Sequence, residues 1–258
     1  HFGSSRASGP ASWTGAGPSG GLLDACQMSQ YLSFNTNVIA KINIPGCPEH
    51  ETAENLSALR QPMYLKTPWC LWEQVATGGY ATSKVVTFDS VQNFWSVWNG
   101  VPQPSELLDN KRFFREMPTG SAPQSIDAIM IFREGIEPQW EDKANATGGH
   151  FQIQLKPTSG GGQIDEYWNN LVLAMIGETM EAGQHVTGVR LVDKLTGKGK
   201  VTDAIRLELW YHSKTTPKEV LDLKKSVERA MITKLDGSTG PGFRADALLD
   251  KKHAPLGK

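Results

Sequence analysis

The stretch IEPQWEDKANATGGHFQIQL, residues 136–155, decides how this 258-residue chain is interpreted. Its second part, HFQIQL, alternates polar and apolar residues and therefore predicts a strand. Its first part places Trp140 in a loop, close to a proline and directly before Glu141 and Asp142. A tryptophan followed by two acids, in a loop bounded by proline and glycine, is poorly placed for a core. We therefore interpret Trp140 as a binding residue, with a packed structural role as the alternative.

Segments on both sides of this stretch show the periodicity of strands and helices. Short β-branched or alternating runs predict strands at 84–88, 127–132, 150–155, 186–194 and 204–211. Apolar residues at helical spacing predict helices after Asp89, over 164–180 and after Thr216, with capping boxes at Asp89 and Thr216. The combination predicts an α+β fold, in which helices cover one face of an antiparallel or mixed sheet and the other face is open to a ligand.

Composition divides the chain into three parts. Residues 1–60 are weakly patterned and contain much Gly, Ser and Pro, so we expect a mostly disordered N-terminal extension. The compact domain is expected over residues 61–250. Residues 251–258 are expected to form a flexible C-terminal tail.

The charge balance limits the classes of partner. The chain has 26 basic and 27 acidic residues, whereas a protein that follows long nucleic acid by its phosphates is usually basic. Three cysteines without a CxxC pair argue against a disulfide framework or a zinc knuckle. The sequence contains no apolar run of membrane-spanning length and no secretory signal at its start. We expect a monomer in the cytoplasm, with the nucleus as a second location and no membrane binding.

Trp140 and Glu141 together suit a guanine base. The indole can stack on the base, and the carboxylate can accept hydrogen bonds from N1–H and the exocyclic amine of guanine. Methylation at N7 makes the base cationic, which adds a cation–π attraction of roughly 2 kcal/mol when the contact is desolvated. Base–aromatic stacking adds about 1–3 kcal/mol per face. These residue types therefore predict selection of a charged guanine over a neutral one.

Four motifs carry a resemblance to a known family: TPWCLWEQ, TFDSVQNFWSVWN, IEPQWED with GGHFQIQL, and EYWNNLVLAMIGE. In this order, over about residues 63–211, they resemble the messenger-RNA cap-binding translation initiation factor 4E family, as a divergent, protist-type member. The resemblance implies a curved antiparallel sheet with a concave cap-binding face, backed by three helices on the convex face. It implies a 7-methylguanosine cap as ligand, no cofactor, no metal and no catalysis.

The resemblance implies roles for four residues at the cap base. Trp140 stacks on the base, and Glu141 reads the guanine edge. Tyr80 is the nearest aromatic to the position of the second stacking residue, with a surface-loop tyrosine as the alternative. Trp210 aligns with the tryptophan that contacts the methyl group. Strand alternation places Arg206 on the same face, about 13 Å away at ~3.3 Å per residue.

Five basic or histidine residues are candidates for the cap phosphates. By resemblance, Arg206 and Lys194 take the places of the phosphate-binding lysine and arginine. Lys198 and Lys200 lie in a long loop between them, where they either reach phosphates or stay solvated. His150 either lines the phosphate path or starts its strand in a structural role, which is the favoured interpretation.

A second surface is expected on the helices. Trp95, Val91 and Leu173 align with a groove that receives an amphipathic helix from the initiation scaffold protein or from repressors. Asn170 stands where the family has an acidic residue, and Leu65 ends a Met-Tyr-Leu segment where the family has His-Pro-Leu. Packing of Trp95 in the core is the alternative. Trp69, Trp72 and Trp168 match family positions that are used for the core.

Three functions are compatible with these residues. The first is a cap-binding factor that recruits initiation partners, and the alternative is a cap-binding repressor or storage factor that does not engage the usual scaffold. The third is an interaction module that has lost cap affinity. An enzyme is not expected, because the chain lacks a Nudix-like acidic helix, a P-loop, HExxH and GxSxG.

Overall fold

The computed structural model describes residues 12–13, 61–76, 81–109, 111–117, 121–196, 203–234, 236–244 and 246–253. Most of the expected N-terminal extension lies outside these ranges, as do Tyr80, Lys198, Lys200 and residues 254–258. Among the described helices, none is long and apolar enough to cross a membrane.

The described strands form one sheet. They are β1 (Ser12–Trp13), β2 (Tyr64–Val75), β3 (Thr82–Ser90), β4 (Phe113–Arg115), β5 (Gln124–Arg133), β6 (Gly149–Leu155), β7 (Val186–Asp193), β8 (Ile205–Tyr211) and β9 (Leu249–Lys252). The order is β1-β4-β5-β7-β8-β6-β9, and β2 pairs with both β3 and β5. These pairings are antiparallel except for the parallel pair β1–β4. The five predicted strand segments are confirmed, with shifts of a few residues at their ends.

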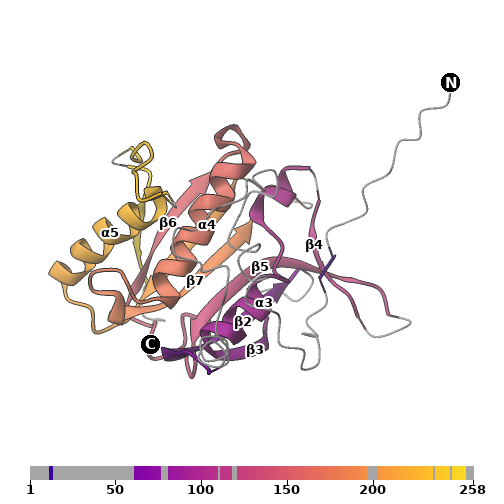
Figure 1. Cartoon of the computed structure of the whole chain (residues 1–258), viewed down its shortest axis with the longest axis horizontal. Helices are drawn as coiled ribbons and strands as arrows, with labels where there is room; N and C mark the ends of the chain where they lie inside the picture. The colour runs from indigo at the N-terminus through magenta and orange to yellow at the C-terminus, as the bar shows by residue number, and fades with distance from the viewer. Residues whose placement is uncertain are drawn as a thin grey trace, which may run out of the picture.

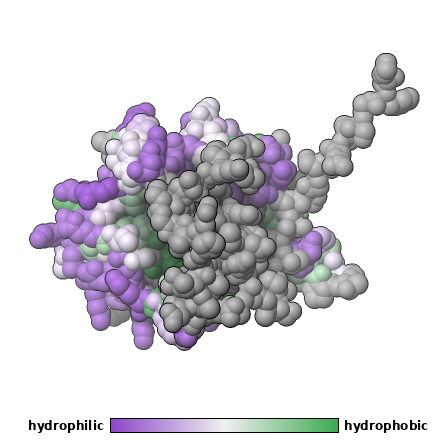
Figure 2. All heavy atoms as spheres, in the orientation of Figure 1, coloured by the Kyte–Doolittle hydropathy of each residue, from purple (hydrophilic) through white to green (hydrophobic). Residues whose placement is uncertain are grey.

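Three α-helices cover one side of this sheet (Figure 1). They are α3 (Val91–Trp98), α4 (Gly161–Ile176) and α5 (Pro217–Ile232), and short 3-10 turns lie at Pro104–Asp109, Pro157–Ser159 and Gly183–His185. The main hydrophobic core lies between the helices and the sheet and contains the fully buried Trp69 and Trp168. Figure 2 shows a mostly hydrophilic outer surface around α5, whose buried apolar residues are Val220, Leu223, Val227 and Met231. The predicted α+β class with three helices on one face is therefore confirmed.

The opposite side of the sheet, which we call the open face, carries a smaller apolar cluster. Ala128, Met130, Phe132, Val192 and Trp210 are buried there, and Trp72 and Ile136 pack against them. Trp72, which was expected in the core, is half-buried against this second cluster, whereas Trp69 belongs to the main core. An offset of three residues along a strand places the two indoles on opposite faces.

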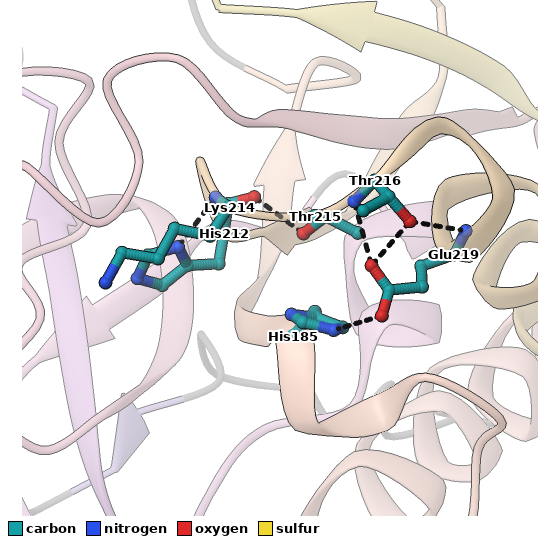
Figure 3. A network of polar contacts seen from close by, with 6 residues as sticks. All are labelled: His185, His212, Lys214, Thr215, Thr216 and Glu219. Atoms are coloured by element: carbon teal, nitrogen blue, oxygen red, sulfur yellow. Dashed lines mark hydrogen bonds and ion pairs between the residues drawn. The ribbon is translucent and has the colours of Figure 1, made fainter.

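The two predicted helix starts differ in outcome. At α5 the capping box is confirmed, because the Thr216 hydroxyl accepts from Glu219 N and the Glu219 carboxylate accepts from Thr216 N at 2.8 Å (Figure 3). His185 also contacts Glu219, at 3.0 Å between Nε2 and Oε1. At α3 the expected box at Asp89 is wrong, because β3 continues to Ser90 and the Ser90 hydroxyl is the cap.

The C-terminal boundary of the domain also differs from the expected one. Residues 251–252 belong to β9, which pairs with β6 in the register Gly149↔Lys252. The next residue, His253, is buried. The ordered domain therefore extends at least to residue 253, and the expectation of a flexible tail from residue 251 is wrong for these residues.

Candidate functional site

A cavity of about 470 Å³ opens on the open face of the sheet. Most of its walls are polar or charged side chains from β5, β6, β7, β8 and the segment around β9. The lining residues are Gln74, Asp127, Trp140, His150, Gln152, Arg190, Val192, Lys194, Arg206, Glu208, Lys251, Lys252 and His253. Five of them are lysine or arginine and two are acids, so the cavity favours an anionic ligand.

Trp140 lies at the rim of this cavity on the loop between β5 and β6. Its side chain is 53% exposed, whereas most other tryptophans of the described residues are buried or half-buried. The loop beneath it is braced by Asn145, which is fully buried and whose amide donates to Glu137 O at 2.9 Å and to Gln139 O at 3.0 Å. Asp142 accepts from Glu137 N at 2.9 Å and Ala144 N at 2.8 Å. A rigid backbone thus presents an exposed indole, which argues against the packed structural role.

Glu141 is exposed on the same loop and does not line the cavity. Within the described residues, its carboxylate has no hydrogen-bond partner and no ion pair. Its neighbour Asp142, in contrast, is used in the turn itself. Of the two adjacent acids, Glu141 is therefore the one that is available for a ligand beside Trp140.

Trp210 does not have the accessibility that was expected of it. Alternation correctly places it on the open face, but its exposed fraction is 0%. His150 stacks on it at 5.6 Å between ring centroids, His253 lies at 4.5 Å, and Phe132 contacts it edge-on at 5.4 Å. The expected contact between Trp210 and a ligand methyl group is therefore blocked in this structure, because rings from other segments cover the indole.

In the wall of the cavity, a buried carboxylate forms ion pairs with two arginines. Glu208 is 2% exposed and forms ion pairs with Arg190 at 3.1 Å and Arg206 at 2.8 Å, and it accepts from the Trp210 indole at 2.9 Å. Burial acts to raise the pKa of Glu208, but the two guanidinium groups outweigh it and hold the pKa below its usual value. Glu208 is thus ionised and fixes the direction of both arginines, whose charge exceeds its own.

His150 and His253 form a neutral pair in the wall of the cavity. The ring atoms His150 Nδ1 and His253 Nε2 are 3.0 Å apart. Burial lowers the pKa of His150 to about 4 and also lowers the pKa of His253. At neutral pH His150 therefore offers an uncharged imidazole, and it does not add the positive charge expected along a phosphate path.

The family of this chain follows from a comparison with known protein families. A family model described as eukaryotic initiation factor 4E matches residues 64–247, well over half of the chain. The chain belongs to the eukaryotic initiation factor 4E family. This confirms the resemblance seen in the four motifs. Membership of a family of initiation factors also confirms the prediction that the chain is not an enzyme.

Individual relatives agree with this assignment. Eukaryotic translation initiation factor 4E-1 of Schizosaccharomyces pombe is 37% identical over 131 residues, which cover 48% of this chain and 52% of that protein. Eukaryotic translation initiation factor isoform 4E-2 of Oryza sativa subsp. japonica is 25% identical over 219 residues, covering 82% and 93%. The aligned part thus spans about half the length of the first relative and nearly all of the second.

Solved structures share the fold of this 4E-family chain. The Ascaris suum eIF4E-3 structure with an m7G cap superposes with a TM-score of 0.52 at 22% identity, covering 74% of this chain and 98% of that one. The Caenorhabditis elegans eIF4E-3 structure with the 4E-binding protein Mextli and a cap analog gives a TM-score of 0.51 at 22% identity, covering 69% and 90%.

The structure brings together only part of the expected 4E-type phosphate site. Arg206 and Lys194 both line the cavity and are half-buried. Arg190, Lys251, Lys252 and His253 line the same cavity and were not expected there. Alternation along 186–194 could have placed Arg190 on the same face as Val192 and Lys194. The C-terminal residues had no local signal, because their position depends on the pairing of β9 with β6.

Two residues of the expected partner groove lie on α3. Val91 and Trp95 are half-buried on α3, and Trp95 packs edge-on against Phe94 with 5.1 Å between ring centroids. The segment before β2 lies against the start of this helix, because Val91 N donates to Met63 O at 2.8 Å and Met63 N donates to the Gln92 side chain at 3.0 Å. Trp95 therefore combines core packing with a partly accessible surface.

The remaining groove candidates take other positions. Leu65 is half-buried on β2, and Leu173 packs against the main core from α4, also half-buried. Asn170 points towards the end of α5, where its amide donates to Thr233 O at 2.7 Å and to Met231 O at 3.3 Å. Asn170 was expected in the partner groove, but here it satisfies carbonyl groups at a helix C-terminus.

Proposed function

We propose that this chain binds the 7-methylguanosine cap of messenger RNA on the open face of its sheet. A helical segment of an initiation partner would bind to its helix side. The observation that carries the proposal is the exposed Trp140 on a braced loop, at the rim of a cavity with an excess of basic side chains. As a 4E-family member, the chain would act as a binding protein with no catalytic step.

Recognition of the base combines two neighbouring side chains. The free face of Trp140 stacks on the cationic purine, and the attraction between the ring and the positive charge favours the methylated form by roughly 2 kcal/mol. Glu141 accepts hydrogen bonds from N1–H and the amine, which only guanine offers in this arrangement. Tyr80, which lies outside the described residues, is the candidate for the opposite face of the base.

The phosphate chain would lie over the basic cavity. Arg206 and Lys194 reach it from β8 and from the end of β7, and Arg190 adds a further guanidinium group. Glu208 holds Arg190 and Arg206 in place before the ligand arrives, which lowers the entropy cost of ordering them. Lys198 and Lys200 remain candidates for phosphates further along the transcript.

What is seen in relatives supports both halves of the proposal. The Ascaris suum eIF4E-3 structures contain m7G and m2,2,7G caps. The Caenorhabditis elegans eIF4E-3 structures contain the 4E-binding protein Mextli. An amphipathic helix on the α3 side, with Trp95 as an aromatic anchor, is the corresponding partner mode for this chain.

The test is a titration of the full chain with 7-methyl-GTP and with GTP, followed by tryptophan fluorescence. We expect the methylated nucleotide to bind roughly thirtyfold more tightly, as a cation–π contribution of ~2 kcal/mol requires. Glu141→Ala should abolish binding without changing the unfolding temperature. Glu134→Ala, at an exposed position in the same loop, is the matched control and should bind normally. Equal affinity of wild type and Glu141→Ala would refute the assignment.

A further inference from the structure

His253, immediately after β9, lies between the two tryptophans of the site. Its ring is nearly parallel to Trp140, with 5.9 Å between centroids and 25° between planes, which is an offset stack. The same ring lies 4.5 Å from Trp210 at 58°. His253 is only 6% exposed, so it is an integral part of the wall and not a surface residue that happens to touch it.

Three hydrogen bonds fix His253, one through its backbone N–H and one through each ring nitrogen. Its backbone N–H donates to Gly148 O at 3.1 Å, and its Nδ1 lies 2.7 Å from Asn145 O. A carbonyl oxygen only accepts, so Nδ1 carries the proton, and Nε2 accepts from His150 Nδ1 at 3.0 Å. Asn145 is also the residue whose amide braces the Trp140 loop. The His253 ring and the loop that carries Trp140 are therefore both hydrogen-bonded to Asn145.

The strand that delivers His253 is itself firmly docked. Tyr211 Oη donates to Asp250 Oδ1 at 2.5 Å, and Lys252 Nζ donates to Tyr211 Oη at 2.6 Å. Gly149 opposes Lys252 in the β6–β9 register. A Cβ atom at this glycine would come within 2.3 Å of Tyr211 Oη and 2.7 Å of Lys251 O, so the close approach of β9 requires glycine. The second glycine of the GGH motif, Gly149, is thus required for the pairing of β9 with β6.

The His253 ring packs against one face of Trp140, while Trp140 remains 53% exposed. The accessible part of the indole is accordingly the side turned away from His253. Trp210, in contrast, has no exposed surface behind the two histidines. A ligand base can therefore reach Trp140 but not Trp210 in this arrangement.

We propose that His253 is a positioning residue for the cap base: its ring stacks against one face of Trp140 and holds the indole in place for the base, while it also covers Trp210. The inference rests on the proposed cap binding. An indole that is held flat before the ligand arrives loses less freedom on stacking, and this raises affinity without a new contact to the ligand. His253 thus acts through Trp140, and its effect belongs to the base and not to the phosphates.

The test uses the full chain with His253→Ala, His253→Phe and the control Leu249→Ala, an exposed position on β9, which directly precedes His253. Affinities for 7-methyl-GTP and GTP are measured by titration calorimetry. We expect His253→Ala to bind 7-methyl-GTP about twofold to tenfold more weakly, the range of one aromatic pair, with a smaller effect on GTP. The ratio of the two affinities should therefore fall. His253→Phe restores a stacking ring and should recover most of that ratio, and Leu249→Ala should leave it unchanged.

The outcomes separate this inference from the proposed function. Wild type that fails to bind 7-methyl-GTP refutes cap binding itself. Wild type that binds, together with His253→Ala that binds equally well, overturns the positioning role. Tighter binding by His253→Ala also overturns it, since His253 would then occupy space that the base needs. If His253→Ala does not fold, His253→Phe decides: a retained ratio supports the stacking role, and a lost ratio with an unchanged unfolding temperature overturns it.

Discussion

The two faces of the sheet bury tryptophan in different surroundings. On the helix face, Trp69 and Trp168 are fully enclosed among aliphatic and aromatic side chains of three helices. On the open face, Trp210 is equally buried, but it is covered by two histidines and bonded to Glu208. The first face stabilises the domain by removing apolar area from water. On the second face, burial holds charged and aromatic groups in fixed directions beside the cavity.

The largest expected effect is a loss of stability when a buried residue of the helix face is replaced. Trp168→Ala removes a fully buried indole and should lower the free energy of unfolding by about 3–5 kcal/mol. Affinity for 7-methyl-GTP in the remaining folded fraction should stay close to that of wild type. Denaturant unfolding together with a nucleotide titration measures both. A large change in affinity at full folding would show that the two faces are coupled and would break the comparison.

A smaller loss of stability is expected when the pH is lowered, and it should come from His150 on the open face. The pKa of His150 is about 4 in the folded chain and about 6.5 when unfolded, so protons bind preferentially to the unfolded state between these values. The contribution is absent above about pH 6.5 and grows as the pH falls towards 4, where it reaches up to ~3 kcal/mol of destabilisation.

The pH effect is measured as the free energy of unfolding at pH 7 and at pH 5. His253 faces His150 and its pKa is lowered too, while Glu208 opposes these shifts and Arg190 and Arg206 add to the shift at His150. His150→Gln should reduce the difference between the two pH values. An unchanged difference in that variant would assign the acid sensitivity to other groups.

The smallest expected effect concerns binding of a partner peptide at the accessible side of α3. Trp95→Ala should weaken capture of a helical partner peptide by about 2 kcal/mol, as expected for an aromatic anchor, and should spare binding of 7-methyl-GTP. The neighbouring exposed position gives the control Ser96→Ala. Loss of both activities in a pull-down and a titration would mean that Trp95 serves mainly as a core residue.

Local sequence was informative wherever one segment decided the outcome. Periodicity predicted five strand segments, and the Thr216 capping box was confirmed in α5. The position of Trp140 beside Glu141 in a turn-rich loop predicted an exposed indole, which the structure has. Alternation placed Arg206 and Trp210 on one face, because side chains of a strand alternate whatever surrounds them.

Local sequence failed at residues whose surroundings come from far along the chain. Asn170 meets the end of α5 some 60 residues later. His150 gains its neutral state from burial, and His253, about 100 residues later in the sequence, packs against its ring. None of these neighbours leaves a periodic signal near the residue it affects.

The sequence by itself determined the fold class, the family and the loop that presents Trp140 and Glu141, because each depends on short-range pattern and motif. Only the tertiary structure decided that Trp210 is closed off, that Glu208 holds two arginines, and that His253 backs Trp140. Periodicity states which way a side chain points, whereas its depth and charge state depend on which distant segments pack over it. On the open face that segment is β9, about 100 residues from the loop it supports.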